Sequence, residues 1–173
     1  MGNKYNLWSF ILCFLLLGLS FQALYASYNR TWQLAPDALT LWLLSVFNFI
    51  IAIIGFKDKS SKRAKWRSWL TVIITVPLSI AFLLGVAVNT MAREHIETTQ
   101  SPDNEIVIDF YTLNGGAATS ISVTGVLNGP LWFKKRIYYE DPMHEANVEW
   151  KNNYIVTINN HTLNLKKGEV FFD

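Results

Sequence analysis

Three long runs of hydrophobic residues occupy the first half of the chain, and each is long enough to cross a lipid bilayer as a helix. They extend over residues 7–25, 39–56 and 70–88, and none of them contains a charged side chain. A helix of about 19 residues is about 28 Å long, close to the thickness of the hydrocarbon layer. Tryptophan and tyrosine residues gather near the ends of the runs, where the membrane interface favours them. The pattern predicts three transmembrane helices.

In the second half the pattern changes to alternation of hydrophobic and polar residues, which is typical of strands with one buried face. In residues 105–113, for example, Ile106, Ile108 and Phe110 alternate with Val107 and Asp109. Further segments of this kind follow at residues 120–127, 131–140, 146–150, 154–158 and 162–165. We therefore predict an α+β membrane protein, in which three transmembrane helices are followed by a small antiparallel β-meander of five or six strands.

Turn residues separate the predicted strands. Asn159 and Asn160 lie between Ile158 and His161, and asparagine tolerates the positive φ that a two-residue hairpin turn needs. The NGGA segment at 114–117 lacks the lysine and the following helix of a phosphate-binding loop and does not fit a dinucleotide fingerprint, so we interpret it as a hairpin turn. The expected organisation is a membrane anchor at 1–92, a polar tether at 93–103 and a β-domain at 104–173.

Charge predicts the orientation of the helices. The segment between the second and third runs contains six basic residues and one acidic residue: Lys57, Lys59, Lys62, Arg63, Lys65, Arg67 and Asp58. Short basic loops stay in the cytoplasm. We therefore expect a multi-pass protein of the cell membrane with a cytoplasmic N-terminus and an extracytoplasmic β-domain.

Composition excludes several classes of function. Residues 1–92 contain eight basic and two acidic side chains, and residues 93–173 contain seven and eleven, so the basic excess belongs to the loop and gives no support to a nucleic-acid partner. The single cysteine, Cys13, excludes a disulfide within the chain. No Asp, Glu, Lys, Arg or His lies within a predicted span, which disfavours a transporter. Asn48 lies within the second span, and we expect it to hydrogen-bond a neighbouring helix.

The basic triplet at 134–136 lies in the third predicted strand. Acidic residues follow it closely in the sequence, at Glu140, Asp141, Glu145 and Glu149. We expect the two groups to pair across neighbouring strands on the solvent face, where each pair contributes a fraction of a kcal/mol. The alternative is that the triplet contacts anionic headgroups or a partner.

Three histidines are the candidates for metal chemistry. They lie far apart in the sequence, at positions 95, 144 and 161, and the HEANV segment has Val148 where a zinc-protease motif needs its second histidine. A site assembled in space from His144 with Glu145 or Glu149 remains the enzyme alternative. We expect no catalytic residues and no cofactor.

Several segments of the second half resemble one known family. They are SPDNEIVIDFY, NGGAATS, LNGPLWFKKRIYYE, ANVEW and INNHTLNL, within residues 101–165. They are similar to domain of unknown function 5412, a family of small membrane-anchored proteins from Gram-positive bacteria. The resemblance implies membrane anchorage and a bacterial origin, and it implies no activity and no site. Asn160 stands where such a hairpin is expected to have glycine, which predicts a slightly strained turn.

The sequence thus predicts a non-enzymatic bacterial membrane protein whose β-domain binds a protein partner or a component of the cell envelope. Trp132, Lys134, Arg136 and Tyr138 alternate along one predicted strand, and aromatic residues with arginine are common anchors of interfaces. In the structural alternative, Trp132 and Tyr138 pack the sheet onto its own core or onto the membrane. Two other functions stay open: a metal-dependent or hydrolytic envelope enzyme, and a sensor that regulates a neighbouring membrane protein through the spans.

Overall fold

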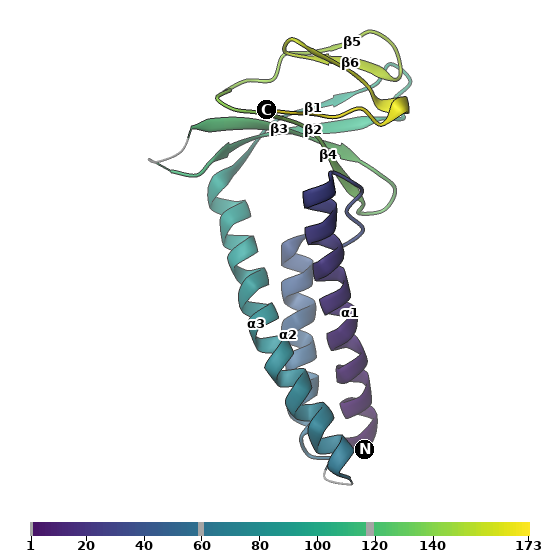
Figure 1. The fold of residues 1–173 in the computed structure, drawn as a ribbon, viewed down its shortest axis with the longest axis vertical. Coiled ribbons are helices and arrows are strands. Elements are labelled where there is room, and N and C mark those ends of the chain that lie inside the picture. The colour runs from purple at the N-terminus through teal and green to yellow at the C-terminus, as the bar shows by residue number, and fades with distance from the viewer. Residues whose placement is uncertain (1, 59–60, 117–119) are drawn as a thin grey trace. The chain divides into compact units, whose positions relative to one another are not determined.

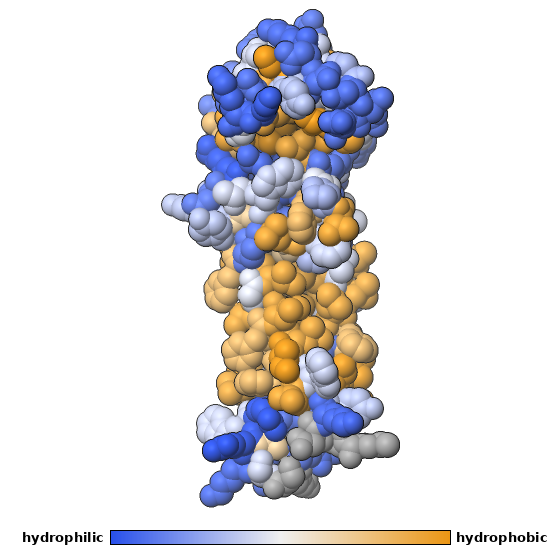
Figure 2. All heavy atoms as spheres, turned by 90° about the vertical axis from the view of Figure 1, so that its right-hand side faces the viewer, coloured by the Kyte–Doolittle hydropathy of each residue, from blue (hydrophilic) through white to orange (hydrophobic). Residues whose placement is uncertain are grey.

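The computed structural model describes residues 2–58, 61–116 and 120–173, and it contains three long helices followed by β-strands (Figure 1). The helices are α1 (Gly2–Asn29), α2 (Ala38–Gly55) and α3 (Lys62–Ala92). All three are long and apolar enough to span a membrane, and the side chains along them form a mostly hydrophobic surface (Figure 2). The prediction of three such helices followed by an antiparallel-rich sheet domain is confirmed.

The chain divides into two compact units. One contains Met1–Gln22 with Ala35–Ala87, and the other contains Ala23–Leu34 with Val88–Asp173. The first unit therefore contains most of the three helices. The end of α1, the last residues of α3 and most of the connection from α1 to α2 lie in the second unit. That connection belongs to the same unit as the strands.

Polar side chains lie between the helices and hydrogen-bond one another. The Asn48 side-chain amide donates to the Thr75 hydroxyl at 3.0 Å, as expected for a polar group in this setting. The Asn6 side-chain amide donates to the Ser68 hydroxyl at 2.6 Å. Cys13 is fully buried. Buried polar groups without a partner are costly in hydrocarbon, so these contacts favour one arrangement of the three helices.

The strands form two sheets. The five-stranded sheet has the order β1-β2-β3-β4-β8, in which only the β4–β8 pair is parallel, and the three-stranded sheet has the order β5-β6-β7. The strands are β1 (Arg93–Gln100), β2 (Val107–Asn114), β3 (Ile121–Asn128), β4 (Lys134–Glu140), β5 (Val148–Trp150), β6 (Ile155–Ile158), β7 (His161–Asn164) and β8 (Phe171–Phe172), and a short 3₁₀-helix covers Leu165–Lys167.

Two expectations about these strands are wrong. The polar segment assigned to a tether contains β1, which pairs with β2 on both sides of a bulge at Ile96. Backbone hydrogen bonds hold this edge strand although its sequence has no regular apolar period. A single meander of five or six strands is also wrong, because β5 to β7 form a separate sheet and β8 returns to the edge of β4. β8 pairs over only two residues, which is too short for an alternating pattern to be seen in the sequence.

The core of the β-domain lies between the two sheets. Ile108 and Phe110 of β2 and Tyr138 of β4 pack with Val156 and Ile158 of β6, and all five are fully buried. The alternation predicted for residues 105–113 is therefore correct. Each of these side chains contributes about 1.5–3 kcal/mol through the removal of apolar surface from water.

The two predicted hairpins are present, with connections of different lengths. Ile158 pairs with His161, and Asn159 adopts a φ of 52°, as the two-residue turn requires. The β2–β3 hairpin pairs as far as Asn114 and Ile121, so its connection is longer than a tight turn. Residues 117–119, which include the last residue of the NGGA segment, and Lys59 of the basic loop lie outside the described residues.

Residues of the α1–α2 connection pair with the start of β4. The backbone N–H of Gln33 donates to the Lys134 carbonyl at 2.8 Å, and the indole Nε1–H of Trp132 donates to the Leu34 carbonyl at 2.8 Å. The Arg30 guanidinium lies 4.0 Å above the centre of the Phe172 ring. The first connection is thus fixed to the five-stranded sheet.

Coupling between Asn48 and Thr75 is testable in mixed micelles. We expect Asn48→Ala to lower the free energy of unfolding by about 0.6 kcal/mol, the average for such bonds between membrane helices. Unfolding of the wild type, Asn48→Ala, Thr75→Val and the double variant by SDS titration measures the coupling. Ile50→Ala, at a half-exposed position on the same helix, is the control. Strictly additive effects of the two substitutions would contradict the bond.

Candidate functional site

One face of the five-stranded sheet carries a group of polar and charged side chains. Ile108 and Phe110 lie in the core, so Asp109 and Tyr111, which alternate with them, lie on the opposite face. The strand register places β1, β3 and β4 residues beside them. We call this surface the polar face, and define it by Arg93, His95, Thr98, Asp109, Tyr111, Asn128, Lys134 and Arg136.

Asp109 is the centre of the hydrogen bonds on the polar face. Its carboxylate accepts from the Thr98 hydroxyl at 2.6 Å and from the Asn128 side-chain amide at 2.7 Å. The Nε2 atom of His95 lies 3.0 Å from the Thr98 hydroxyl. Because that hydroxyl gives its one hydrogen to Asp109, the imidazole must act as the donor through Nε2–H.

The charge on Asp109 is stabilised by these neighbours. Burial by itself raises the pKa of the carboxyl group, but the hydrogen bonds from Thr98 and Asn128 and the nearby Lys134 and His95 outweigh it. The pKa of Asp109 therefore lies below its ordinary value of 3.8. Asp109 holds an anion at the centre of a face whose other charged groups are cations.

Arg93 lies at the edge of the polar face, and its guanidinium lies on an aromatic ring. Its guanidinium carbon lies 3.5 Å from the centre of the Tyr111 ring, a close cation–π contact. Its Nε and one terminal nitrogen are buried, and neither has a hydrogen-bond partner among the described residues. Burial lowers the pKa of Arg93, and the like charge of Arg136 adds to this effect, while Tyr111 and Asp109 act in the opposite direction.

The structure brings together only two of the four residues predicted to share a strand face. Lys134 and Arg136 are exposed on the polar face. Trp132 lies in the turn before β4, because the strand begins at Lys134. Tyr138 is fully buried in the core, as the structural alternative expected.

A β-bulge is the reason that Tyr138 leaves the predicted face. Val126 of β3 pairs with Arg136, and the next residue, Gly125, pairs with Tyr138, which makes Ile137 the extra residue on β4. The bulge reverses the alternation along the strand after Arg136. A Cβ on Gly125 would lie 2.9 Å from the Phe110 ring and 3.1 Å from the Tyr138 Cβ, so glycine is needed where these rings meet.

The basic triplet does not pair with the acidic residues that follow it. Within the described ranges, Lys134, Lys135 and Arg136 form no ion pair, and the Lys135 ammonium donates to the Gly168 carbonyl at 3.4 Å. The predicted cross-strand charge pairs are therefore wrong. Glu140 interacts instead with the other sheet, which removes it from the triplet.

Glu140 belongs to a partly buried polar cluster at the junction of the two sheets. Its carboxylate accepts from the Tyr138 hydroxyl and from the Asn159 amide, the latter at 3.0 Å, and lies 3.8 Å from His161 Nε2. The His161 ring stacks on Phe171 at 3.6 Å between centres.

Burial raises the pKa of Glu140, but the bonds from Tyr138 and Asn159 outweigh it, so the pKa lies below 4.5. Burial raises the pKa of Tyr138, and its bond to Glu140 raises it further. The cluster fixes the β6–β7 turn to β4.

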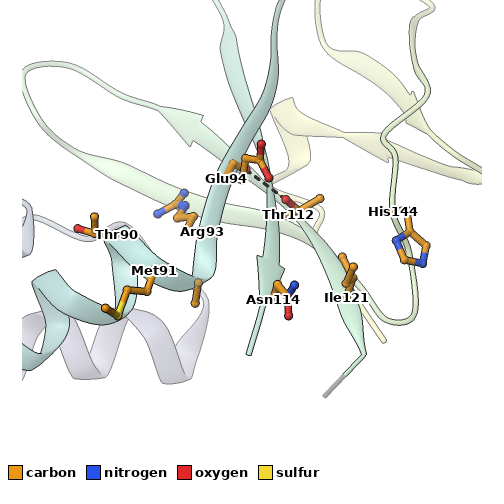
Figure 3. Close-up of a pocket in the computed structure, with 9 residues that line it drawn as sticks. Thr90, Met91, Arg93, Glu94, Thr112, Asn114, Ile121 and His144 are labelled. Atoms are coloured by element: carbon orange, nitrogen blue, oxygen red, sulfur yellow. Dashed lines mark hydrogen bonds between the residues drawn. The ribbon is translucent and has the colours of Figure 1, made fainter. Parts of the chain in front are cut away.

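A pocket of about 440 Å³ lies where α3 ends and β1 begins (Figure 3). His144 lines one side of it, opposite Thr90 and Met91, and the residues of the enzyme alternative, Glu145 and Glu149, are not among its lining residues. No group of three or more His, Cys, Asp or Glu residues in the described part of the chain could hold a metal ion. The metal-dependent or hydrolytic alternative stays a prediction.

Sequence reasoning missed the contribution of β1 to the polar face. Arg93, His95 and Thr98 come from a segment without an apolar period, so nothing predicted that they would lie beside Asp109. The adjacent β-branched residues Thr98 and Thr99 were the available signal for a strand. The bulge at Ile137 left no signal in the sequence.

Comparison with known proteins identifies a family whose function is unknown. The model of a family described as a family of unknown function, DUF5412, matches residues 63–173, which include most of α3 and all eight strands. This range is wider than the segment that carries the resemblance in the sequence. No curated protein and no solved structure matches the chain.

The Glu140 cluster predicts a pH-dependent stability. A lowered folded-state pKa means that the ionised carboxylate stabilises the fold above pH about 4.5, and that this stability is lost as the pH falls through the folded-state pKa. We expect Glu140→Gln to lower the free energy of unfolding at about pH 7 by about 1.5–3 kcal/mol, the range for bonds to charged groups. The difference from wild type should shrink at about pH 3.

Near-ultraviolet circular dichroism of the full chain in detergent, followed during urea unfolding at both pH values, measures the difference. Glu149→Gln removes the same charge from an exposed position and is the control. Equal effects of the two substitutions at about pH 7 would refute the role given to the cluster.

Proposed function

The chain belongs to the family of unknown function DUF5412, and we propose that it is a non-enzymatic membrane-anchored protein whose β-domain binds a protein partner or an envelope component outside the cytoplasm. The observation that supports this proposal is the polar face. Lys134 and Arg136 are exposed there and form no ion pair in the described part of the chain, so their charges are available to an anionic ligand.

The proposed orientation depends on the basic loop. Lys57 follows α2 and the basic residues at 62–67 lie in the first turns of α3, and moving them across a bilayer is unfavourable. If this loop stays in the cytoplasm, α3 leads out of it, and the β-domain follows α3 on the outer side of the cell membrane. An anionic partner there is an acidic protein surface or a negatively charged envelope polymer.

The turn before β4 extends the proposed binding surface. Leu131 is 80% exposed and Trp132 is 52% exposed. Leu131 adopts a φ of 61°, which is unfavourable for a residue with a Cβ. A strained turn that presents two large apolar side chains beside Lys134 is suited to recognition, since buried aromatic side chains are common anchors of interfaces.

The sensor function is a second candidate because the α1–α2 connection pairs with this same region. Gln33 and Leu34 hydrogen-bond residues 132–134, directly beside the proposed surface. A ligand that moved the start of β4 would therefore act on the segment that joins the first two spans. The binding function requires no such movement.

Capture in intact cells tests the proposal. We expect a photo-crosslinking residue placed at Leu131 of the full chain to capture a defined partner. Replacement of both Lys134 and Arg136 by glutamine should reduce the capture about tenfold or more, because two charge contacts are lost. Lys166→Gln with Lys167→Gln removes the same charge from exposed positions near the C-terminus and is the matched control.

Two outcomes separate the candidates. A second crosslinking residue at Phe47, on the exposed side of α2, should capture the same partner if the protein regulates a neighbour through its spans. Capture from Leu131 alone supports the binding function. Equal capture by the Lys134/Arg136 variant and its control would contradict the proposed surface.

A further inference from the structure

The two-residue strand β8 is held to the domain by few backbone bonds. It pairs with β4 at Tyr138 and Tyr139, and the Asp173 N–H donates to the Tyr139 carbonyl at 3.1 Å. Its Phe171 ring packs against the core and has its centre 5.6 Å from that of Tyr138 and 3.6 Å from that of His161. A strand with so few bonds opens locally more readily than strands that pair over seven or eight residues. The side-chain contacts of Phe171 therefore contribute much of what keeps β8 closed.

His161 of β7 is the titratable partner in these contacts. Its ring lies nearly parallel to the Phe171 ring, at an interplanar angle of 18°. Its Nε2 atom lies 3.8 Å from the carboxylate of Glu140 on β4. The His161 side chain is 33% exposed, so protons reach it from solvent without any opening of the domain. One imidazole thus contacts both β4 and β8.

The groups that face His161 include one charge, and it is negative. From β4 these groups are Glu140 and Tyr138, whose hydroxyl donates to the Glu140 carboxylate. Burial raises the pKa of Tyr138, so that hydroxyl stays neutral. The β6–β7 turn contributes the uncharged amide of Asn159, which donates to the same carboxylate at 3.0 Å. From β8, His161 meets the uncharged ring of Phe171.

Protonation of His161 strengthens both of its contacts. The imidazolium attracts the Glu140 carboxylate, which is ionised above pH about 4.5 because its pKa is lowered. A cation on the face of the Phe171 ring also gains a cation–π attraction that the neutral imidazole lacks. Histidine is the residue type that changes charge between about pH 5 and 8. Closure of β8 should therefore gain as the pH falls through this range, and the gain should disappear once the pH falls through the Glu140 pKa.

We propose that His161 is a pH-dependent switch that holds β8 on the domain when protonated and loosens it when neutral. Phe172, the other residue of β8, stacks on Tyr139 and lies 4.0 Å from the Arg30 guanidinium. Arg30 belongs to the α1–α2 connection and to the same compact unit as the strands. Release of β8 would therefore also remove a contact of that connection. This switch goes beyond the proposed function, because it requires neither a partner nor an orientation in a membrane.

Hydrogen exchange of the purified full chain in a neutral detergent, followed by mass spectrometry, tests the switch. We expect the amides of residues 171–173 to open about threefold less often at about pH 5.5 than at about pH 7.5, after correction for the intrinsic effect of pH on exchange. A threefold change corresponds to the contribution of a partly exposed ion pair. An equal opening frequency of the wild type at the two pH values would overturn the proposal.

Two matched variants separate His161 from other effects of pH. His161→Phe keeps an aromatic ring against Phe171 but carries no charge, so it should open equally often at both pH values. His144→Phe removes a histidine that lines the pocket at the start of β1, and it should keep the wild-type difference. A wild-type pH dependence in His161→Phe, or its loss in His144→Phe, would contradict the role of His161.

Each variant is compared with itself at two pH values, so a variant of lower stability does not imitate the expected result. His161→Gln, which is neutral and polar, provides a second test and should also open equally often at both pH values. Because the measurement uses the purified chain alone, its failure leaves the capture experiment at Leu131 unaffected. Failure of that capture likewise leaves the switch intact.

Discussion

The constraint on which the rest of the structure depends is that charges and unpaired polar groups are excluded from hydrocarbon. It accounts for three uncharged runs in the sequence, and for polar side chains between the helices that bond to one another, such as Asn48 with Thr75. It also accounts for the place at which the pattern ends. The first charged residue after the third run is Arg93, and there the chain changes from helix to strand.

The β-domain repeats the same separation of apolar and polar groups at smaller scale. Its two sheets enclose the apolar core, and the polar groups at their junction, Tyr138, Glu140 and Asn159, satisfy one another. On the opposite side of the five-stranded sheet, Asp109 accepts from Thr98 and Asn128, while Lys134 and Arg136 form no ion pair among the described residues. That imbalance is the feature of the domain that internal stability does not explain, and the proposed binding surface follows from it.

The sequence predicted the parts of the fold that depend on periodic burial, and it failed where other interactions decide. The three helices, the β2 alternation around Ile108 and Phe110, and the Asn159–Asn160 turn follow from hydrophobicity and backbone preference alone. β1 has no apolar period, and the two-residue β8 pairs with a strand more than thirty positions away, so neither left a pattern to detect. The predicted site failed at Tyr138 because one bulge residue, Ile137, changes which side chains share a face.

The central claim is that the basic loop lies on one side of the membrane and the β-domain lies on the other. Labelling of intact cells with a membrane-impermeant maleimide tests it most directly, since the native Cys13 is buried. A cysteine introduced at the exposed position Lys151 should be labelled in intact cells, and one introduced at Lys65, at the basic start of α3, should be labelled only after the membrane is permeabilised. Labelling of Lys65→Cys in intact cells, with Lys151→Cys protected, would contradict the account.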